Sequence, residues 1–154
     1  MPKFIIISSG AVTKPDSLAY KFTNLFGKIL DYKLLGENSV RRLYQSANNP
    51  AVSYTIIRPG GLGDGKAVGA IGIELNQKDT ISGEVNREDV AEAVVAAVAS
   101  KSLPVDVTFE IYQEDRKSVL EGKFPEKSGY ERSGKLLHGN YEEMFAELVP
   151  DQKL

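Results

Sequence analysis

Short extended runs of apolar residues recur along this chain and predict its strands. Residues 4–8, 52–57 and 105–112 are rich in β-branched and aromatic side chains, and Gly, Pro, Asn or Asp residues bound them. Such runs are typical of strands, and near-continuous apolar character is typical of strands buried on both faces. Residues 80–82 form a shorter piece that we also expect to be extended.

Longer stretches between these runs carry apolar residues at helical spacing. The pattern predicts long helices over residues 28–46 and 87–99 and shorter ones over residues 16–26 and 141–148. Asp16 or Ser17 and, on the later helix, Asn86 are the expected N-caps, because a short polar side chain there can accept an amide hydrogen bond of the first turn. On the helix over residues 87–99, we expect Val90, Val94, Val95 and Val98 to form the buried stripe.

Strands that alternate with amphipathic helices predict an α/β fold, with a mainly parallel sheet and flanking helices. Residues 113–140 are charged and poor in apolar residues, which indicates a surface loop. We expect residues 1–154 to form a single domain, because the length suits one hydrophobic core.

Composition excludes several classes of function. With a net charge of −2 and no basic block, the chain is a poor partner for nucleic acid or an anionic membrane surface. The absence of Cys and the presence of one His, His138, leave no basis for a thiolate metal site or a Ser-His-Asp triad. No apolar run approaches the ~20 residues that a membrane-spanning helix needs.

A glycine-rich stretch follows the strand over residues 52–57 and resembles a phosphate-binding loop. Residues 60–67 nearly match G-x-x-x-x-G-K-[ST], but Ala67 lacks the hydroxyl that binds Mg²⁺. Gly69 and Gly72 also disfavour the helix that such a loop must open. We therefore interpret the stretch as a sharp strand exit, with a role in lining a ligand site as the alternative.

Four segments carry a resemblance to a known family: "VSYTIIRPGGL", "NREDVAEAVVAAV", "FIIISSGAV" and "YKLLGENSVRRL". Together they resemble the atypical short-chain dehydrogenase/reductase family and, within it, the NmrA-like NAD(P)-binding Rossmann proteins. The resemblance extends over nearly the whole chain. It corresponds to the C-terminal half of the family's domain, the region of strands five to seven, and the G-x-x-G-x-x-G loop of the front half has no counterpart.

The resemblance implies a set of site residues. Ser8 or Ser9 corresponds to the family's serine at a strand end, and Lys33 corresponds to its catalytic and ribose-binding lysine. Ile29 stands where the family has the proton-donating Tyr, and we expect Tyr32 to point to a different face of the helix. The loop of the family that passes the nicotinamide of NADP or NAD corresponds to Arg58, Pro59, Gly60, Gly61 and Leu62.

Structural interpretations of the same residues stay open. For Lys33 we favour a solvated helix position paired with Glu37, and the two serines are explained equally by turn hydrogen bonds. For Arg58 we favour a bridge to an acid on a helix, and for Asp89 a first-turn acid that complements the helix dipole. A lone His138 in a loop is more often a surface residue than a catalytic one.

The function that the resemblance implies is that of an NAD(P)-binding, oxidoreductase-like partial domain without independent catalysis. The alternatives are a non-catalytic assembly module, which another protein chain meets at an open sheet edge, or a truncated fragment. Relatives of this kind are often plastid proteins, and the sequence does not choose between plastid and cytoplasm.

Overall fold

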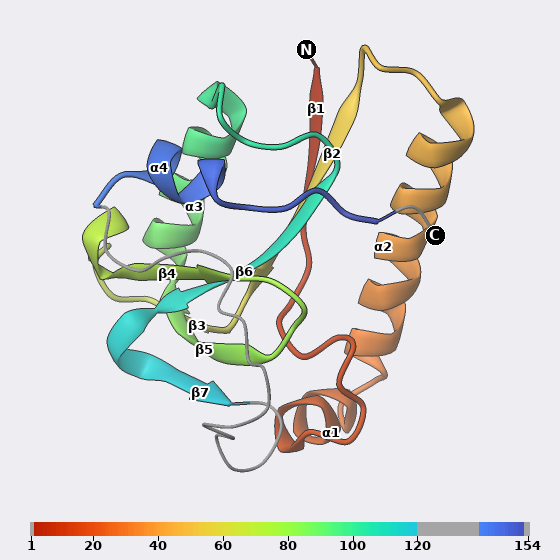
Figure 1. The fold of residues 1–154 in the computed structure, drawn as a ribbon. Coiled ribbons are helices and arrows are strands. Elements are labelled where there is room, and N and C mark those ends of the chain that lie inside the picture. The colour runs from red at the N-terminus through yellow and green to blue at the C-terminus, as the bar shows by residue number, and fades with distance from the viewer. Residues whose placement is uncertain (1, 120–138, 153–154) are drawn as a thin grey trace, which may run out of the picture.

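The computed structural model describes residues 2–119 and 139–152, which form two sheets with helices on both faces of the larger one (Figure 1). The larger sheet has the order β1-β2-β6-β4, from β1 (Lys3–Ile7), β2 (Ser53–Pro59), β6 (Val107–Gln113) and β4 (Ile73–Asn76). β1, β2 and β6 run parallel, and β4 is antiparallel to β6. The expected α/β fold with a mainly parallel sheet is confirmed.

Four helices accompany these strands, within a residue or two of the expected bounds for the longer ones. They are α1 (Leu18–Asn24), α2 (Ile29–Ala47), α3 (Arg87–Ala99) and α4 (Tyr141–Ala146). Ser17 caps α1 as expected, since its hydroxyl accepts the Tyr20 amide. Asn86 occupies the N-cap of α3, but its side chain makes no capping hydrogen bond and is used elsewhere.

A small second sheet has the order β3-β5-β7, from β3 (Gly61–Gly63), β5 (Ile81–Asn86) and β7 (Lys117–Val119). A 3₁₀ turn at Glu114–Arg116 precedes β7, and another at Ala70–Gly72 precedes β4. The loop expected over residues 113–140 is therefore wrong for its first part, because β7 pairs there with β5. Residues 120–138, including His138, lie outside the described part.

The core follows the two faces of the larger sheet. Ile57, Val107, Phe109 and Ile111 face α3 and α4, where Met144 and Phe145 are buried. On the opposite face, Tyr54 and Ile56 pack against Val40 of α2. Because side chains alternate along a strand, Arg58, Thr108 and Glu110 share the α2 face, which is therefore partly ionic.

The buried stripe of α3 differs from the expected one. Val90 is buried, but Val95 and Val98 are about two-thirds exposed, and Ala93 and Ala97 face the core. Small side chains let the helix lie close to the sheet, so two of the four valines of α3, Val95 and Val98, lie outside its buried face.

Candidate functional site

The two strand ends that the sequence singled out meet at one edge of the larger sheet. The Ser8 amide donates to the Ile57 carbonyl at 2.8 Å, and the Gly10 amide donates to the Pro59 carbonyl at 2.8 Å. The Gly60 amide donates to the Ile111 carbonyl of β6 at 3.2 Å. The structure thus brings Ser8, next to Ser9, and the loop after Pro59 together at the carboxyl ends of parallel strands, where ligands of open α/β sheets bind.

Lys33 projects from α2 toward the end of β1. Its Nζ donates to the Ser8 carbonyl at 3.0 Å and to the Ile7 carbonyl at 3.4 Å. Burial lowers the pKa of this amine, and the nearby charge of Glu37 opposes that shift. The ion pair expected between Lys33 and Glu37 is not formed, because Glu37 is engaged by arginines.

Arg58 and Glu37 form the centre of a buried ion cluster beneath α2. Arg58 Nε and Nη2 donate to the two oxygens of Glu37 at 3.0 and 2.6 Å, and Nη1 donates to Glu110 Oε1 at 3.1 Å. Arg41 Nη1 donates to Glu37 Oε2 at 3.1 Å. The predicted bridge from Arg58 to an acid on a helix is confirmed. The Arg58 side chain is therefore engaged by Glu37 and Glu110, and only the Arg58 backbone adjoins the loop after β2.

Opposing effects set the ionisation of this cluster. Burial by itself would raise the pKa of Glu37, but the hydrogen bonds and charge of Arg58 hold it below its ordinary value, with help from Ser8 and Arg41. The Ser8 hydroxyl helps to lower the pKa of Glu37, although its oxygen forms no hydrogen bond within the usual limits of distance and angle. Burial raises the pKa of Glu110 to about 8.

The loop after β2 is held very close to the second sheet. A Cβ on Gly60 would lie 1.9 Å from the Gly83 carbonyl oxygen, so only Gly fits. A Cβ on Gly61 would meet nothing nearer than 3.6 Å, and Leu62 is half exposed. Gly61 and Leu62, in β3, therefore lie at an accessible surface.

Residues at the start of α3 bind the glycine-rich segment of residues 64–69, which follows β3, and together they form a clamp. Asn86 Nδ2 donates to the Lys66 carbonyl at 2.7 Å, and Arg87 pairs with Asp64. The Glu88 carboxylate accepts the Ala67 amide at 2.9 Å. Each of these contacts joins one residue of α3's start to one residue of the loop.

Asp89 completes this clamp from a fully buried position. Its Oδ1 accepts the Val68 and Gly69 amides at 2.8 and 3.0 Å. The expectation that Asp89 serves the helix dipole missed this role, because sequence spacing alone does not show which backbone amides come near. The phosphate-loop geometry is absent here, since Gly69 leads into a 3₁₀ turn and a strand.

Asp79 is a further residue that the sequence did not single out. Its carboxylate accepts the Ala11 amide at 2.6 Å and both the amide and the hydroxyl of Thr13, at 2.9 and 2.8 Å. It thereby fixes the loop that follows Ser8 and Ser9. No local sequence motif marks this role, because the contact spans 68 residues of sequence.

A cleft of about 430 Å³ opens between the end of β1 and the start of α2. Its lining includes Ser8 and Lys33, which were expected at the site, and also Tyr32. The prediction that Tyr32 points to a different face of the helix is wrong, since it lines the same cleft as Lys33.

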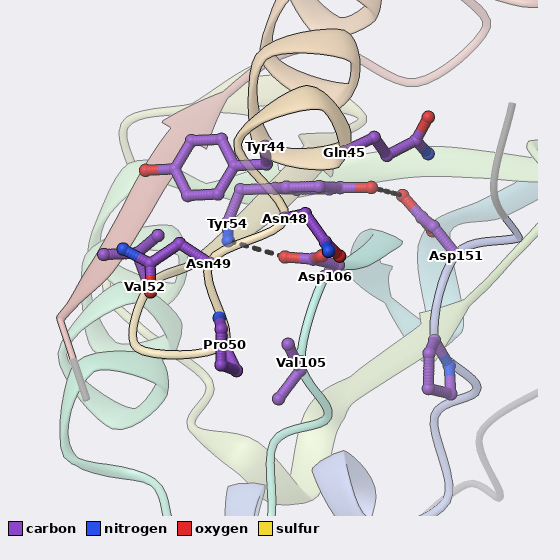
Figure 2. A pocket seen from close by; sticks show the side chains of 11 residues that line it. Tyr44, Gln45, Asn48, Asn49, Pro50, Val52, Tyr54, Val105, Asp106 and Asp151 are labelled. Carbon is purple, nitrogen blue, oxygen red and sulfur yellow. Dashed lines mark hydrogen bonds between the residues drawn. The ribbon is translucent and has the colours of Figure 1, made fainter.

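A second hollow, of about 460 Å³, lies at the opposite end of the sheet (Figure 2). There the Tyr54 hydroxyl donates to Asp151 Oδ2 at 3.0 Å, and the Tyr54 amide donates to Asp106 Oδ1 at 3.1 Å. Asp151 also accepts from the Thr108 amide and hydroxyl and from Arg41. This carboxylate is therefore occupied in fixing the C-terminal segment against β2, β6 and α2.

The described residues offer neither a metal-binding cluster nor a membrane-spanning helix. No group of three or more His, Cys, Asp or Glu side chains in residues 2–119 and 139–152 could hold a metal ion. No helix in that part of the chain has the length and apolar character to cross a membrane.

Comparisons with known proteins show a similar α/β fold. An uncharacterized chloroplastic protein of Arabidopsis thaliana is 34% identical over 105 residues, which are 62% of this chain and 33% of that protein. The structure of chuY from Escherichia coli CFT073 matches with a TM-score of 0.55 and 26% identity, over 75% of this chain and 58% of that one. The oxidoreductase ylbE of Lactococcus lactis has a similar fold, with a TM-score of 0.50 and 19% identity over 73% of this chain and 47% of that one.

This chain therefore spans about a third of the curated relative that it matches and about half of the two solved structures. The family whose model matches is described as NAD(P)H-binding, and the match covers residues 1–101. It is shorter than the nearly full-length resemblance expected from the sequence, since β6, β7 and α4 lie beyond it. On this match over about two-thirds of its length, the chain belongs to the NAD(P)H-binding family.

Proposed function

We propose that this chain is the C-terminal half of an NAD(P)-binding, oxidoreductase-like domain of the atypical short-chain dehydrogenase/reductase type, close to the NmrA-like proteins. In this proposal it supplies the nicotinamide side of a dinucleotide site. The observation that carries the proposal is that Lys33 donates to the Ser8 carbonyl at the end of β1, next to the end of β2 from which the Gly60–Leu62 backbone continues.

The residues fit one end of the cofactor only. An exposed glycine backbone and a half-buried amine suit a nicotinamide and its ribose, and the bound cofactor would supply a hydride. A pyrophosphate needs a glycine-rich turn that leads from a strand into a helix N-terminus. β1 is instead followed by the loop that Asp79 holds, so we expect another polypeptide segment to provide that part.

Within this proposal, each residue has a limited role. Ser8 or Ser9 and Lys33 would hold the nicotinamide ribose and orient the reacting group. Pro59, Gly60, Gly61 and Leu62 would contact the nicotinamide through the backbone, and Arg58 would act as a positioning residue through Glu37. Ile29 replaces the proton-donating Tyr, so we expect no independent catalysis.

Titration of the isotopically labelled chain with the two halves of the cofactor tests the proposal. We expect nicotinamide mononucleotide to shift the amide resonances of Leu62 and Lys33 at millimolar concentration, and adenosine monophosphate to leave them unchanged. Micromolar affinity for NADPH in the isolated chain would contradict the proposal, because it would require a complete pyrophosphate site.

A second candidate function, a non-catalytic assembly module, is favoured by the free edge of β1. In the described part of the chain, β1 pairs with β2 alone, and Phe4 and Ile7 are 48% and 41% exposed. The only charged residue of β1, Lys3, turns away to donate to the Ala97 and Ser100 carbonyls at the end of α3. Such an edge invites a strand from another chain. Light scattering that shows a monomer at micromolar concentration would argue against this function.

A further inference from the structure

One stripe of α2 faces the cleft beside β1. Ile29, Tyr32, Lys33 and Gly36 follow one another at spacings of three, one and three residues, so they lie on one face of the helix. Ile6, Ile7 and Ser8 form the facing wall. The volume of about 430 Å³ falls in the range of pockets that bind small molecules.

Gly36 is the unusual member of this stripe. It lies in the interior of a 19-residue helix, where Gly is less favourable than Ala. A Cβ at this position would meet no atom within 4 Å, so neither packing nor backbone conformation requires Gly. Because Gly36 has no side chain, the cleft stays open next to the helix backbone.

The lining indicates what the cleft would hold. Most of it is aliphatic, and the polar groups are the Lys33 amine, the Tyr32 phenol and Ser8. Two carbonyl oxygens, of Ile7 and Ser8, orient the amine, which leaves it one further N–H to donate. The matching ligand has an apolar body and one acceptor oxygen.

We propose that this cleft is a small-molecule site for an apolar compound with one acceptor oxygen, and that Gly36 keeps it open. The oxygen accepts from Lys33, and the apolar body lies along α2 beside Gly36. The meaning of the site rests on the proposed function, in which Lys33 serves the nicotinamide ribose, so ligand and cofactor would compete for the one N–H that Lys33 has left. The binding itself needs no cofactor, so the two proposals fail separately.

Fluorine NMR with para-fluoroacetophenone and no nucleotide tests this site. We expect the chain to broaden the fluorine resonance, and Gly36→Leu to weaken the binding about tenfold or more, because the added side chain fills the cleft. Gly36→Ala should weaken it less while raising the thermal midpoint by about 2–4 °C, through helix propensity. Stability and binding then change in opposite directions, which a purely structural role for Gly36 would not produce.

Leu35→Ala is the matched control, because Leu35 is an exposed apolar residue of α2 outside the cleft. It should leave the broadening unchanged. Equal loss in Leu35→Ala and Gly36→Leu would mean general adhesion to apolar surface and would overturn the proposal, as would wild-type binding by Gly36→Leu. If Gly36→Leu instead lowers the molar mass in light scattering, a second copy of the chain occupies the cleft and the proposal is also wrong.

Discussion

Replacing Glu37 with Gln tests whether the buried ion cluster holds α2 on the sheet. Glu37 is fully buried and accepts three hydrogen bonds, from Arg58 Nε, Arg58 Nη2 and Arg41 Nη1. Gln keeps the shape of the side chain but removes the charge, and its amide group would point N–H donors at a guanidinium. Two buried cations would then lose the anion that they share.

The expected loss of stability is large for a single polar substitution. Removing one partner of a buried ion pair costs about 3–5 kcal/mol. For a chain of this length each kcal/mol lowers the thermal midpoint by about 2–4 °C, so Glu37→Gln should lower it by roughly 6–20 °C. Circular dichroism during heating and during urea titration would measure both quantities.

Glu84→Gln is the matched control, because it makes the same change in an exposed ion pair with Arg116. Exposed pairs contribute about 0–1 kcal/mol, so this variant should unfold within about 4 °C of the unmodified chain. If the two variants lose equal stability, the cluster around Glu37 does not hold the fold together and the reasoning is refuted.

Three further predictions concern the site edge and the sheet. The pKa of Glu110 is raised to about 8 in the folded chain, so the folded chain keeps a proton that the unfolded chain releases above about pH 4.5. The free energy of unfolding should therefore fall as pH rises from about 4.5 to 8. Urea titrations of Glu110→Gln should lack this part of the decline. Gly60→Ala should cost about 1–3 kcal/mol in urea unfolding because its Cβ overlaps the Gly83 carbonyl, whereas Gly61→Ala should cost far less, and equal losses would contradict the close approach. Asp89→Asn should speed hydrogen exchange of the Val68 and Gly69 amides, as measured by NMR, and unchanged exchange would mean that the clamp does not hold the loop.

The sequence predicted the elements whose pattern is strong. The strands at β1, β2 and β6 are long β-branched runs, and the helical spacing in α2 outweighed the glycine within it. The bridge from Arg58 to an acid on a helix was also predicted, because an arginine at a buried strand end needs an anion, but the sequence had paired Glu37 with Lys33 instead.

Other features could not be predicted because they depend on contacts between distant segments. β3 is a strand of Gly61–Gly63 with a single apolar side chain, so only its pairing with β5 defines it. The clamp on the loop consists largely of side chains that bind backbone amides, which leaves no trace in hydrophobic periodicity. Tyr32 was misplaced because adjacent helix positions, although 100° apart, can both reach one wide cleft.

The clamp between residues 64–69 and the start of α3 has a practical consequence for protein engineering. Asn86, Arg87, Glu88 and Asp89 each bind a different part of that loop, so neither segment keeps its shape without the other. A chimera that imports the loop from a homologue must import the first turn of the helix with it. Recombination breakpoints between residues 70 and 85 would separate two segments that work only as a matched set.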